Sequence, residues 1–443
     1  MRAEERGIVL VTVLLLALTN RNMPEAGDRQ LAEFRSRDRL WSTPNLGLLT
    51  VAALLPDSFE ITYVDQTFEA IPERGFTYVL LSPSTAQAPE AYRIADHYRR
   101  RGSRVLMGGP HVTVCPEEAA RHADTVFVGE SEELFPLFFR EERQGRAKKI
   151  SRARRYPPLE SSLVPRYDLA MKYPYKSVPI QLSRGCPHQC RFCLSSKIYG
   201  KMVRRKTREQ AKREIAAIRT HWKRPFLFFT DDNFCINPAY TDSILDILMG
   251  SPVDWYAFTD VSVCNKGHLL DKMAAAGCRK LLIGFESLSK NNLHQINASG
   301  FKETRLATYR TAVSAIQSRR IGVVGSFVLG LEDDTPETFE RLYTFILDTC
   351  LYGTNITVST PFPGTDMYRA MIESGVPLPT DWSLYDGFTL LHPLRHMTAD
   401  RFQSNYRELL ARLNSPERIR RIYQYFHHGY LKYDESEERN QTL

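Results

Sequence analysis

The sequence has little that points to a membrane. Its most apolar run, residues 8–18, follows Arg2 and Arg6 and so resembles a secretory signal. The run is too short to span a bilayer, and residues 19–22 after it offer no small-residue cleavage site. A first strand buried on both faces of a parallel sheet also reads as a continuous aliphatic run. We therefore interpret residues 8–18 as that strand, and expect no membrane partner.

The sequence also lacks a disulfide framework. Five of its eight cysteines are scattered singly in apolar or helical surroundings, whereas the other three lie within eight residues of one another. Thiols of this kind fit a reducing compartment. We therefore expect a cytoplasmic protein.

Strong charge bias, repeats and low-complexity segments are missing as well. The net charge of +8 is modest for 443 residues, and its basic clusters are dispersed along the chain. Such clusters are more typical of solvated faces than of a nucleic-acid surface, so we expect no nucleic-acid partner. With 43% apolar residues the chain has ample material for buried cores. Its length suits two or three domains.

What is present is a concentrated group of sulfur ligands. Cys186, Cys190 and Cys193 follow C-x3-C-x2-C spacing directly after a short apolar run. Thiolates suit iron–sulfur clusters or zinc. A [4Fe-4S] cube has four irons, so three cysteines leave one iron open. A structural zinc needs four ligands, and His188, the nearest fourth, sits in a cramped position between two cysteines. The spacing therefore favours the cluster over zinc.

Strands alternate with helices through most of the chain, which predicts an α/β fold. We expect a Rossmann-like, doubly wound parallel sheet within residues 1–143 and a proline-punctuated linker at 144–177. Six strand–loop–helix units follow within 178–375, which predicts a partial (β/α)6 TIM-like barrel with its chemistry at the carboxyl ends of the strands. A helical C-terminal tail occupies 376–443. Its expected helices are residues 397–413 and 416–430.

Polar residues stand where barrel strands are expected to end. Asp231, Asp232, Asp260 and Glu286 occupy such positions. A single carboxylate there is often only a helix cap, but their recurrence around one mouth favours a site. In the first domain, Gly108-Gly109 and Gly129-Glu130 follow strands in the same way. Glycine lets backbone approach a ligand closely, although each turn alone is also typical of an ordinary left-handed turn.

The cysteine motif, with Phe192 before the last cysteine, resembles the signature of the radical SAM superfamily. The flanking Arg184-Gly185-Cys186-Pro187 is similar to the branch with an N-terminal cobalamin-binding-type domain. This resemblance implies that S-adenosylmethionine chelates the open iron through its amino and carboxylate groups. One electron then cleaves it to methionine and a 5′-deoxyadenosyl radical, which abstracts hydrogen from a small-molecule substrate. An electron donor such as flavodoxin or ferredoxin is implied.

The resemblance also implies roles for individual residues. In the barrel, the segment containing Asp231 and Asp232 contacts the methionine amino group, and Glu286 contacts the ribose or the substrate side. The segment 322–330, with Gly325 and Ser326, flanks the adenine. Phe192 packs on the nucleoside. In the first domain, the loops carrying Gly108, Gly109, Gly129 and Glu130 resemble those that bind cobalamin.

One corrinoid motif is missing. Many corrinoid proteins carry D-x-H-x-x-G, whose histidine ligates cobalt, and His97, His111 and His122 do not fit it. Relatives in this branch commonly lack the motif, so cobalamin and an empty crevice both remain open. We expect a radical SAM enzyme that modifies a small metabolite, with cobalamin-dependent methyl transfer to an unactivated carbon as the leading reaction. The alternatives are a B12-independent dehydratase or dehydrogenase acting on an aminoglycoside-type sugar, and a non-catalytic corrinoid- or zinc-binding module.

Overall fold

The computed structural model describes residues 11–19, 43–297 and 299–429. The start of the run 8–18, most of the segment 19–43 and the acidic C-terminal end lie outside these residues. The described residues form two compact units. The first comprises 11–19, 43–225 and 360–391, and the second comprises 226–359, without residue 298, and 392–429. Among the described helices, none is both long enough and apolar enough to cross a bilayer.

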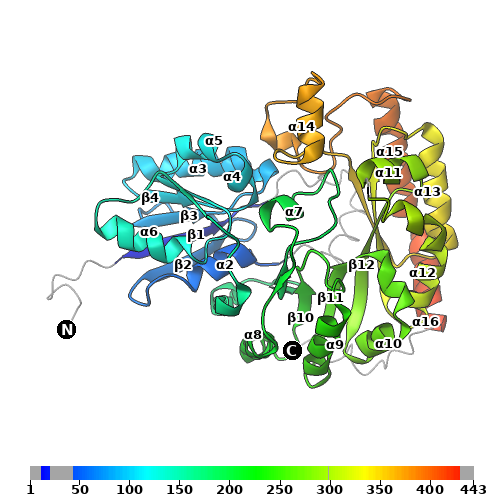
Figure 1. Ribbon diagram of the computed structural model, residues 1–443, viewed down its shortest axis with the longest axis horizontal. Helices are drawn as coiled ribbons and strands as arrows, with labels where there is room; N and C mark the ends of the chain where they lie inside the picture. Colours follow the sequence, from blue (N-terminus) through cyan, green and yellow to red (C-terminus); the bar gives the residue numbers. More distant parts are fainter. Residues whose placement is uncertain (1–10, 20–42, 298, 430–443) are drawn as a thin grey trace. The chain divides into compact units, whose positions relative to one another are not determined.

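A six-stranded parallel sheet forms the centre of the first unit (Figure 1). Its strand order is β2-β1-β3-β4-β5-β6. The strands are β1 (Thr12–Ala17), β2 (Glu60–Asp65), β3 (Tyr78–Leu81), β4 (Arg104–Met107), β5 (Thr125–Val128) and β6 (Ile150–Arg152). Residues 13–16 of β1 are completely buried, which confirms the strand expected there. β6 comes from the segment predicted as a linker, where three residues are too few to show a period in the sequence.

Helices cover both faces of this sheet (Figure 1). They are α2 (Leu46–Ala52), α3 (Ala88–Arg100), α4 (Pro110–Val114), α5 (Pro116–His122) and α6 (Leu134–Arg143), with short 3-10 turns η2 (Thr85–Gln87), η3 (Leu159–Ser161) and η4 (Tyr167–Ala170). On one face α3 packs Ile94 and Tyr98 against Val79 and Val105 of the strands. On the other, Phe135 of α6 stacks on Phe127 of β5, with ring centroids 4.4 Å apart. The doubly wound arrangement is confirmed.

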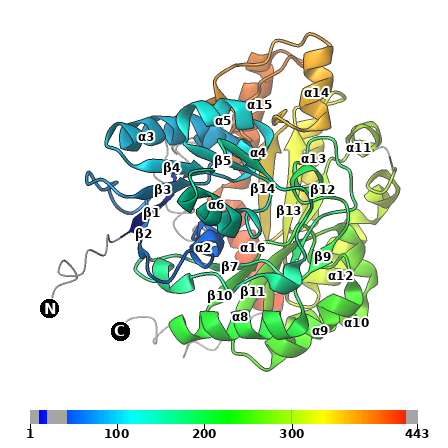
Figure 2. The same ribbon diagram turned by 60° about the vertical axis from the view of Figure 1, so that its left-hand side comes forward.

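The second sheet also has six strands, in the order β14-β13-β12-β11-β10-β7. They are β7 (Val178–Ile180), β10 (Phe226–Phe229), β11 (Asp254–Thr259), β12 (Cys278–Glu286), β13 (Gly322–Leu329) and β14 (Gly353–Val358). β10 to β14 pair in parallel, each with the next (Figure 2). β14 and β7 stand at the two ends of this order and do not pair. The sheet therefore stays open, as expected for a partial barrel.

Helices alternate with these strands. They are α8 (Arg208–His221), α9 (Pro238–Met249), α10 (Gly267–Ala275), α11 (Lys290–Ile296), α12 (Tyr309–Gln317) and α13 (Pro336–Asp348), with 3-10 turns η5 (Val261–Asn265) and η6 (Glu303–Thr308). A short antiparallel hairpin, β8 (Ser183–Arg184) and β9 (Arg204–Arg205), encloses α7 (Ser195–Ile198) and the cysteine motif.

The remaining helices are α14 (Asp366–Glu373), η7 (Trp382–Leu384), α15 (Ala399–Leu413) and α16 (Pro416–Gly429). The last two confirm the helices expected in the tail. α15 is amphipathic and buries Phe402, Tyr406 and Leu409. The Phe402 ring lies 5.6 Å from that of Phe339 in α13, so this helix completes the core of the second unit.

Side-chain caps explain where several helices begin. Asn45, Thr207, Asn237, Thr365 and Thr398 each accept a hydrogen bond from a backbone N–H in the first turn of the following helix. Such caps satisfy amide groups that have no partner inside the helix. The loops that precede these helices therefore end at defined positions.

Candidate active site

The hairpin β8–β9 presents the cysteine motif. Gly185, between β8 and Cys186, has a φ of 101°. A Cβ atom at this position would lie 2.3 Å from the carbonyl oxygen of Met202, on the other side of the hairpin. The backbone N–H of Cys186 donates to the carbonyl of Gly200 at 3.2 Å. The close approach of the two chains therefore requires glycine at 185 and fixes the start of the cysteine loop.

The three cysteines lie on one short loop between β8 and α7. Cys186 and Cys193 are half-buried and Cys190 is buried. The N–H of Cys193 donates to the carbonyl of Cys190 at 3.0 Å, which folds this part of the loop into a turn. No disulfide joins any of the chain's eight cysteines, all of which lie in the described residues. Three soft thiolate donors on one half-buried loop fit an iron–sulfur cluster. Phe192, between the last two cysteines, is half-buried.

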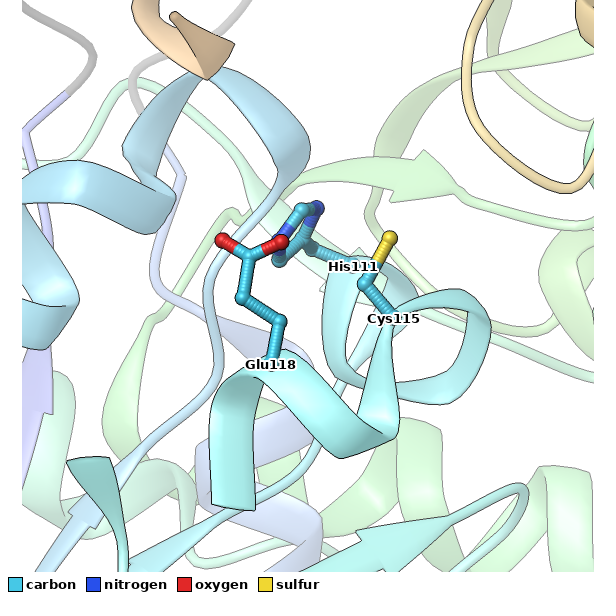
Figure 3. A group of neighbouring side chains, drawn as sticks. All are labelled: His111, Cys115 and Glu118. Carbon is cyan, nitrogen blue, oxygen red and sulfur yellow. The ribbon is translucent and has the colours of Figure 1, made fainter. Parts of the chain in front are cut away.

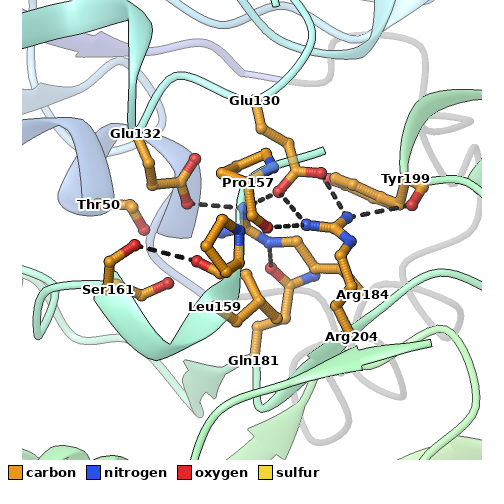
Figure 4. A network of polar contacts seen from close by, with 12 residues as sticks. Thr50, Glu130, Glu132, Pro157, Leu159, Ser161, Gln181, Arg184, Tyr199 and Arg204 are labelled. Atoms are coloured by element: carbon orange, nitrogen blue, oxygen red, sulfur yellow. Dashed lines mark hydrogen bonds and ion pairs between the residues drawn. The ribbon is translucent and has the colours of Figure 1, made fainter. Parts of the chain in front are cut away.

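Two arginines of this hairpin converge on one acid (Figure 4). Arg184 and Arg204 both donate to the carboxylate of Glu130, the residue after Gly129 in the loop that follows β5. The structure thus places the Glu130 side chain in an ion-pair network with the cysteine-bearing hairpin. The two arginines are partners that sequence reasoning missed, because they lie 54 and 74 positions away from Glu130.

Glycine turns line the carboxyl edge of the first sheet. Gly109 after β4 has a φ of 94°, and a Cβ there would meet Ser82 Oγ at 2.5 Å. Gly129 after β5 has a φ of 93°. At Gly108 an added Cβ would make only ordinary contacts, the nearest 3.8 Å away. The strand order reverses between β1 and β3, and a reversal of this kind opens a crevice at the carboxyl edge. A backbone-lined edge beside a crevice fits a large ligand such as cobalamin.

His111 lies beside Cys115 and Glu118 in the helical segment that follows β4 (Figure 3). It is fully buried, its Nε2 lies 3.0 Å from the hydroxyl of Tyr92, and burial lowers its pKa to about 4. Atoms of His111, Cys115 and Glu118 that could bind a metal lie within 4.8 Å of one another. The Glu118 carboxylate, however, accepts from the indole N–H of Trp382 at 2.9 and 3.1 Å, and burial raises the pKa of Cys115 to about 12. These contacts form a local cluster, in which the Nδ1 atom of His111 is buried and makes no hydrogen bond within the described residues.

In the second unit, carboxylates follow β10 and β11 as expected. Asp231 is 1% exposed and Asp232 is half-buried. Asn233 donates to Asp260 at 2.6 Å, which links the ends of the two strands. Asp260 also accepts from the backbone N–H of Ser262 at 2.7 Å and caps η5. The helix-cap role is therefore realised at Asp260, and Asn233, within the segment 231–234 expected to contact S-adenosylmethionine, is bonded to it.

Glu286 occupies a strained position at the end of β12. Its φ is 65°, which is uncommon outside glycine, and the pairing of β12 with β13 shifts register between Gly284 and Glu286. Lys302 donates to the Glu286 carboxylate at 2.8 Å and to the Gly284 carbonyl at 3.0 Å. Strain and bulges cluster at functional sites. The conformation thus favours a functional role for Glu286, with Lys302 as a partner that nothing in the sequence signals.

Gly325 and Ser326 lie on opposite faces of β13. A Cβ at 325 would meet Leu351 and Phe327 side-chain atoms at 2.8 Å, so packing alone accounts for this glycine. Ser326 is half-buried and accepts from the side-chain amide of Asn355 on β14 at 3.1 Å. Ser326 therefore remains the candidate of the two for contact with a ligand, together with Asn355.

Comparisons with known proteins identify both domains that the sequence motifs predict. The model of the radical SAM superfamily matches residues 180–346, and that of the B12 binding domain matches residues 41–139. Bacteriochlorophyllide d C-12(1)-methyltransferase of Chlorobaculum tepidum is 28% identical over 374 residues, which cover 82% of this chain and 81% of that protein. Hopanoid C-2 methylase of Rhodopseudomonas palustris is 26% identical over 86% of this chain and 73% of its own length.

Two solved structures show the same fold. TsrM from Kitasatospora setae, a radical S-adenosylmethionine methyltransferase with cobalamin and a [4Fe-4S] cluster bound, superposes with a TM-score of 0.63 at 17% identity, covering 84% of this chain and 81% of TsrM. OxsB, a cobalamin-dependent radical enzyme with aqua-cobalamin and S-adenosylmethionine bound, gives 0.68 at 14% identity, covering 95% of this chain and 71% of OxsB. The chain is therefore a radical SAM enzyme that also carries a B12-binding domain, and it shares its fold with these two cobalamin-dependent structures.

Proposed function

We propose that this enzyme transfers a methyl group to an unactivated carbon of a small, predominantly apolar, polycyclic metabolite. The observation that supports the proposal is the pairing of both family domains in a chain several of whose relatives are named as methylating enzymes. Two of these relatives are named for methylation of a bacteriochlorophyllide and of hopanoids, and the similarity extends over more than four-fifths of this chain.

When bound, the cluster and S-adenosylmethionine supply a radical that removes hydrogen from substrate, and cobalamin supplies the methyl group. The chain's own part is to hold and orient these groups. Cys186, Cys190 and Cys193 are the thiolates suited to three of the four irons. Asp231 and Asp232 offer acceptors for a cationic amino group, and Glu286 offers a carboxylate suited to a ribose or to the substrate.

Backbone geometry supports the assignment of the first domain to cobalamin. Gly109 and Gly129 let the chain approach a ligand with bare backbone at the edge of the sheet. His111 is buried and bonded to Tyr92, so in our proposal the corrinoid is held without this histidine as a ligand to cobalt.

The proposal includes a cytoplasmic location and an electron donor such as flavodoxin or ferredoxin. Cleavage of the sulfonium consumes an electron that no residue of this chain supplies. A reducing compartment keeps cysteine thiols available for metal binding. The proposed location and the proposed electron donor both follow from the chemistry of the cluster.

The experiment is anaerobic reconstitution with iron, sulfide and hydroxocobalamin, followed by reduction with S-adenosylmethionine that carries a trideuterated methyl group. Bacteriochlorophyllide d and a hopanoid serve as probe substrates. We expect a product that carries all three deuterium atoms, together with one 5′-deoxyadenosine for each methyl group transferred. Deuterated product that forms without cobalamin, or 5′-deoxyadenosine with a dehydrated or oxidised product, would contradict the proposal.

Cys190→Ala tests the cluster in the same assay. The variant should lose iron and 5′-deoxyadenosine together, because a thiolate ligand is gone. Cys278→Ala is the matched control, since this cysteine is also buried but lies at the start of β12, away from the motif. The control should keep the iron content and the activity of the wild type.

A further inference from the structure

We propose that Glu130 is a positioning residue for the iron–sulfur cluster. Its carboxylate holds both strands of the hairpin that presents Cys186, and it does not contact cobalamin. The inference rests on the cluster that the family uses and is independent of methyl transfer.

The geometry around Glu130 is that of a closed ion-pair network (Figure 4). Arg204 donates from Nη2 to Oε1 at 2.5 Å and from Nη1 to Oε2 at 3.0 Å, so it grips both carboxylate oxygens. Arg184 donates from Nη1 to Oε2 at 2.5 Å. The side chains of Glu130, Arg184 and Arg204 are 2%, 11% and 16% exposed. Bonds of this kind between charged groups are strong and directional.

Both arginines make further contacts. Arg184 also reaches the carboxylate of Glu132 at 2.6 Å and donates from Nε to the side-chain oxygen of Gln181 at 2.8 Å. Arg204 donates to the carbonyls of Pro157 and Tyr199, at 2.6 and 3.1 Å. Two buried cations thus face two buried anions. Buried charges are tolerated when they are paired in this way.

The network acts on the hairpin because Arg184 and Arg204 are opposite each other in it. β8 and β9 pair only through Ser183 with Arg205 and Arg184 with Arg204. Isolated two-stranded hairpins are marginal, and this one has two residues in each strand. A single carboxylate bonded to both members of a cross-strand pair therefore holds the strands together.

Cys186 lies two residues beyond Arg184. Its N–H donates to the carbonyl of Gly200, the residue after Tyr199, whose own carbonyl accepts from Arg204. Cys186 is thus two residues from Arg184, and Gly200 directly follows the residue whose carbonyl Arg204 binds. Loss of the carboxylate should loosen the position of Cys186.

The same geometry separates the roles of two neighbouring residues. Gly129 offers bare backbone at the edge of the sheet, while the Glu130 side chain is 2% exposed with both oxygens occupied by arginine. A carboxylate that accepts three hydrogen bonds from arginine and is 2% exposed is poorly accessible to a corrinoid. In the loop after β5, Gly129 therefore faces the crevice, whereas the Glu130 side chain binds the hairpin that carries the cysteine loop.

The test uses Glu130→Gln in the full-length, anaerobically reconstituted protein. Glutamine keeps the shape of the side chain but removes the charge that balances two buried arginines. We expect bound iron to fall to less than half of the wild-type value and the change in the reduced cluster's EPR signal on adding S-adenosylmethionine to be weakened. The dissociation constant for hydroxocobalamin, measured by optical titration, should stay within about threefold of wild type.

Glu142→Gln is the control variant. Glu142 pairs with Arg104 in the same unit, at the amino end of β4 and away from the cysteine loop. This variant should keep its iron. Arg184→Lys provides a second variant in case Glu130→Gln does not fold, because it keeps the charge but loses the guanidinium fork. It should lose iron while retaining corrinoid affinity.

Two results would overturn the inference. Wild-type iron content and an unchanged EPR response in a folded Glu130→Gln protein would show that the network does not position the cluster. A tenfold loss of corrinoid affinity, with or without loss of iron, would show that Glu130 serves the cobalamin side. Neither readout depends on a methylated product, so failure of the proposed reaction would be seen separately.

Discussion

Replacing Gly185 with alanine tests how tightly the hairpin holds the cysteine loop. The residue has a φ of 101°, and the added Cβ would lie 2.3 Å from the Met202 carbonyl oxygen and 3.1 Å from that of Gly200. Both contacts are to backbone, which cannot rotate away as a side chain can. The hairpin must therefore open for the variant to fold.

Gly102→Ala separates the effect of the clash from that of the backbone conformation. Gly102 has a φ of 82° in the same unit, and nothing lies within 4 Å of an added Cβ. That variant should lose about 1–2 kcal/mol from the left-handed conformation alone. Gly185→Ala adds an overpacking cost of about 1–3 kcal/mol. We expect the two variants to differ by about 2 kcal/mol.

The assay is thermal unfolding of reconstituted protein, combined with iron analysis. A difference of about 2 kcal/mol corresponds to about 4–8 °C in the Tm of a unit of this size. Gly185→Ala should also bind less iron, since Cys186 moves with the hairpin, whereas Gly102→Ala should bind the wild-type amount. Equal Tm values together with equal iron content would contradict this expectation, because the loop would then have room that the structure does not show.

Three further predictions concern the second unit. Burial raises the pKa of Asp334 from 3.8 to about 6. The stabilisation from the protonated carboxyl is therefore complete below about pH 4 and is lost as the pH rises through 6. The loss amounts to about 3 kcal/mol. Asp334→Asn should flatten this part of the profile of Tm against pH, and a slope equal to that of wild type would count against the shift. Lys302→Met removes the cation beside Glu286 and should lower the rate of 5′-deoxyadenosine formation at least tenfold at unchanged iron content; loss of iron would point to a wider disturbance. Gly325→Ala should lower stability by about 1–3 kcal/mol through overpacking without changing affinity for S-adenosylmethionine, and weaker binding in equilibrium dialysis would instead place Gly325 in the cofactor site.

Local pattern was enough to predict much of the fold and to propose the centre of the site. The aliphatic run of β1, the alternation of strands with helices and the amphipathic α15 are all features of neighbouring residues, and each is present in the structure. The cysteine motif is equally local, because the three candidate ligands of one metal cluster lie within eight residues. Such features are visible in a sequence because their spacing along the chain sets their spacing in space.

Long-range pairings were not predictable in this way. Glu130 stands in the sequence as a polar residue after a glycine turn, and only the tertiary structure brings it to Arg184 and Arg204. The glycine at 325 is explained by packing against Leu351 and Phe327, although it lies in a segment that resembles a cofactor loop.

Short stretches of sequence were enough to predict three cysteines grouped after a strand and two successive parallel sheets. Only the folded chain brings Glu130 to Arg184 and Arg204 and sets Glu286 in its strained conformation beside Lys302. The physical reason is that secondary structure and ligand spacing depend on neighbouring residues. Ion pairs and packing depend instead on which elements the folded chain brings together.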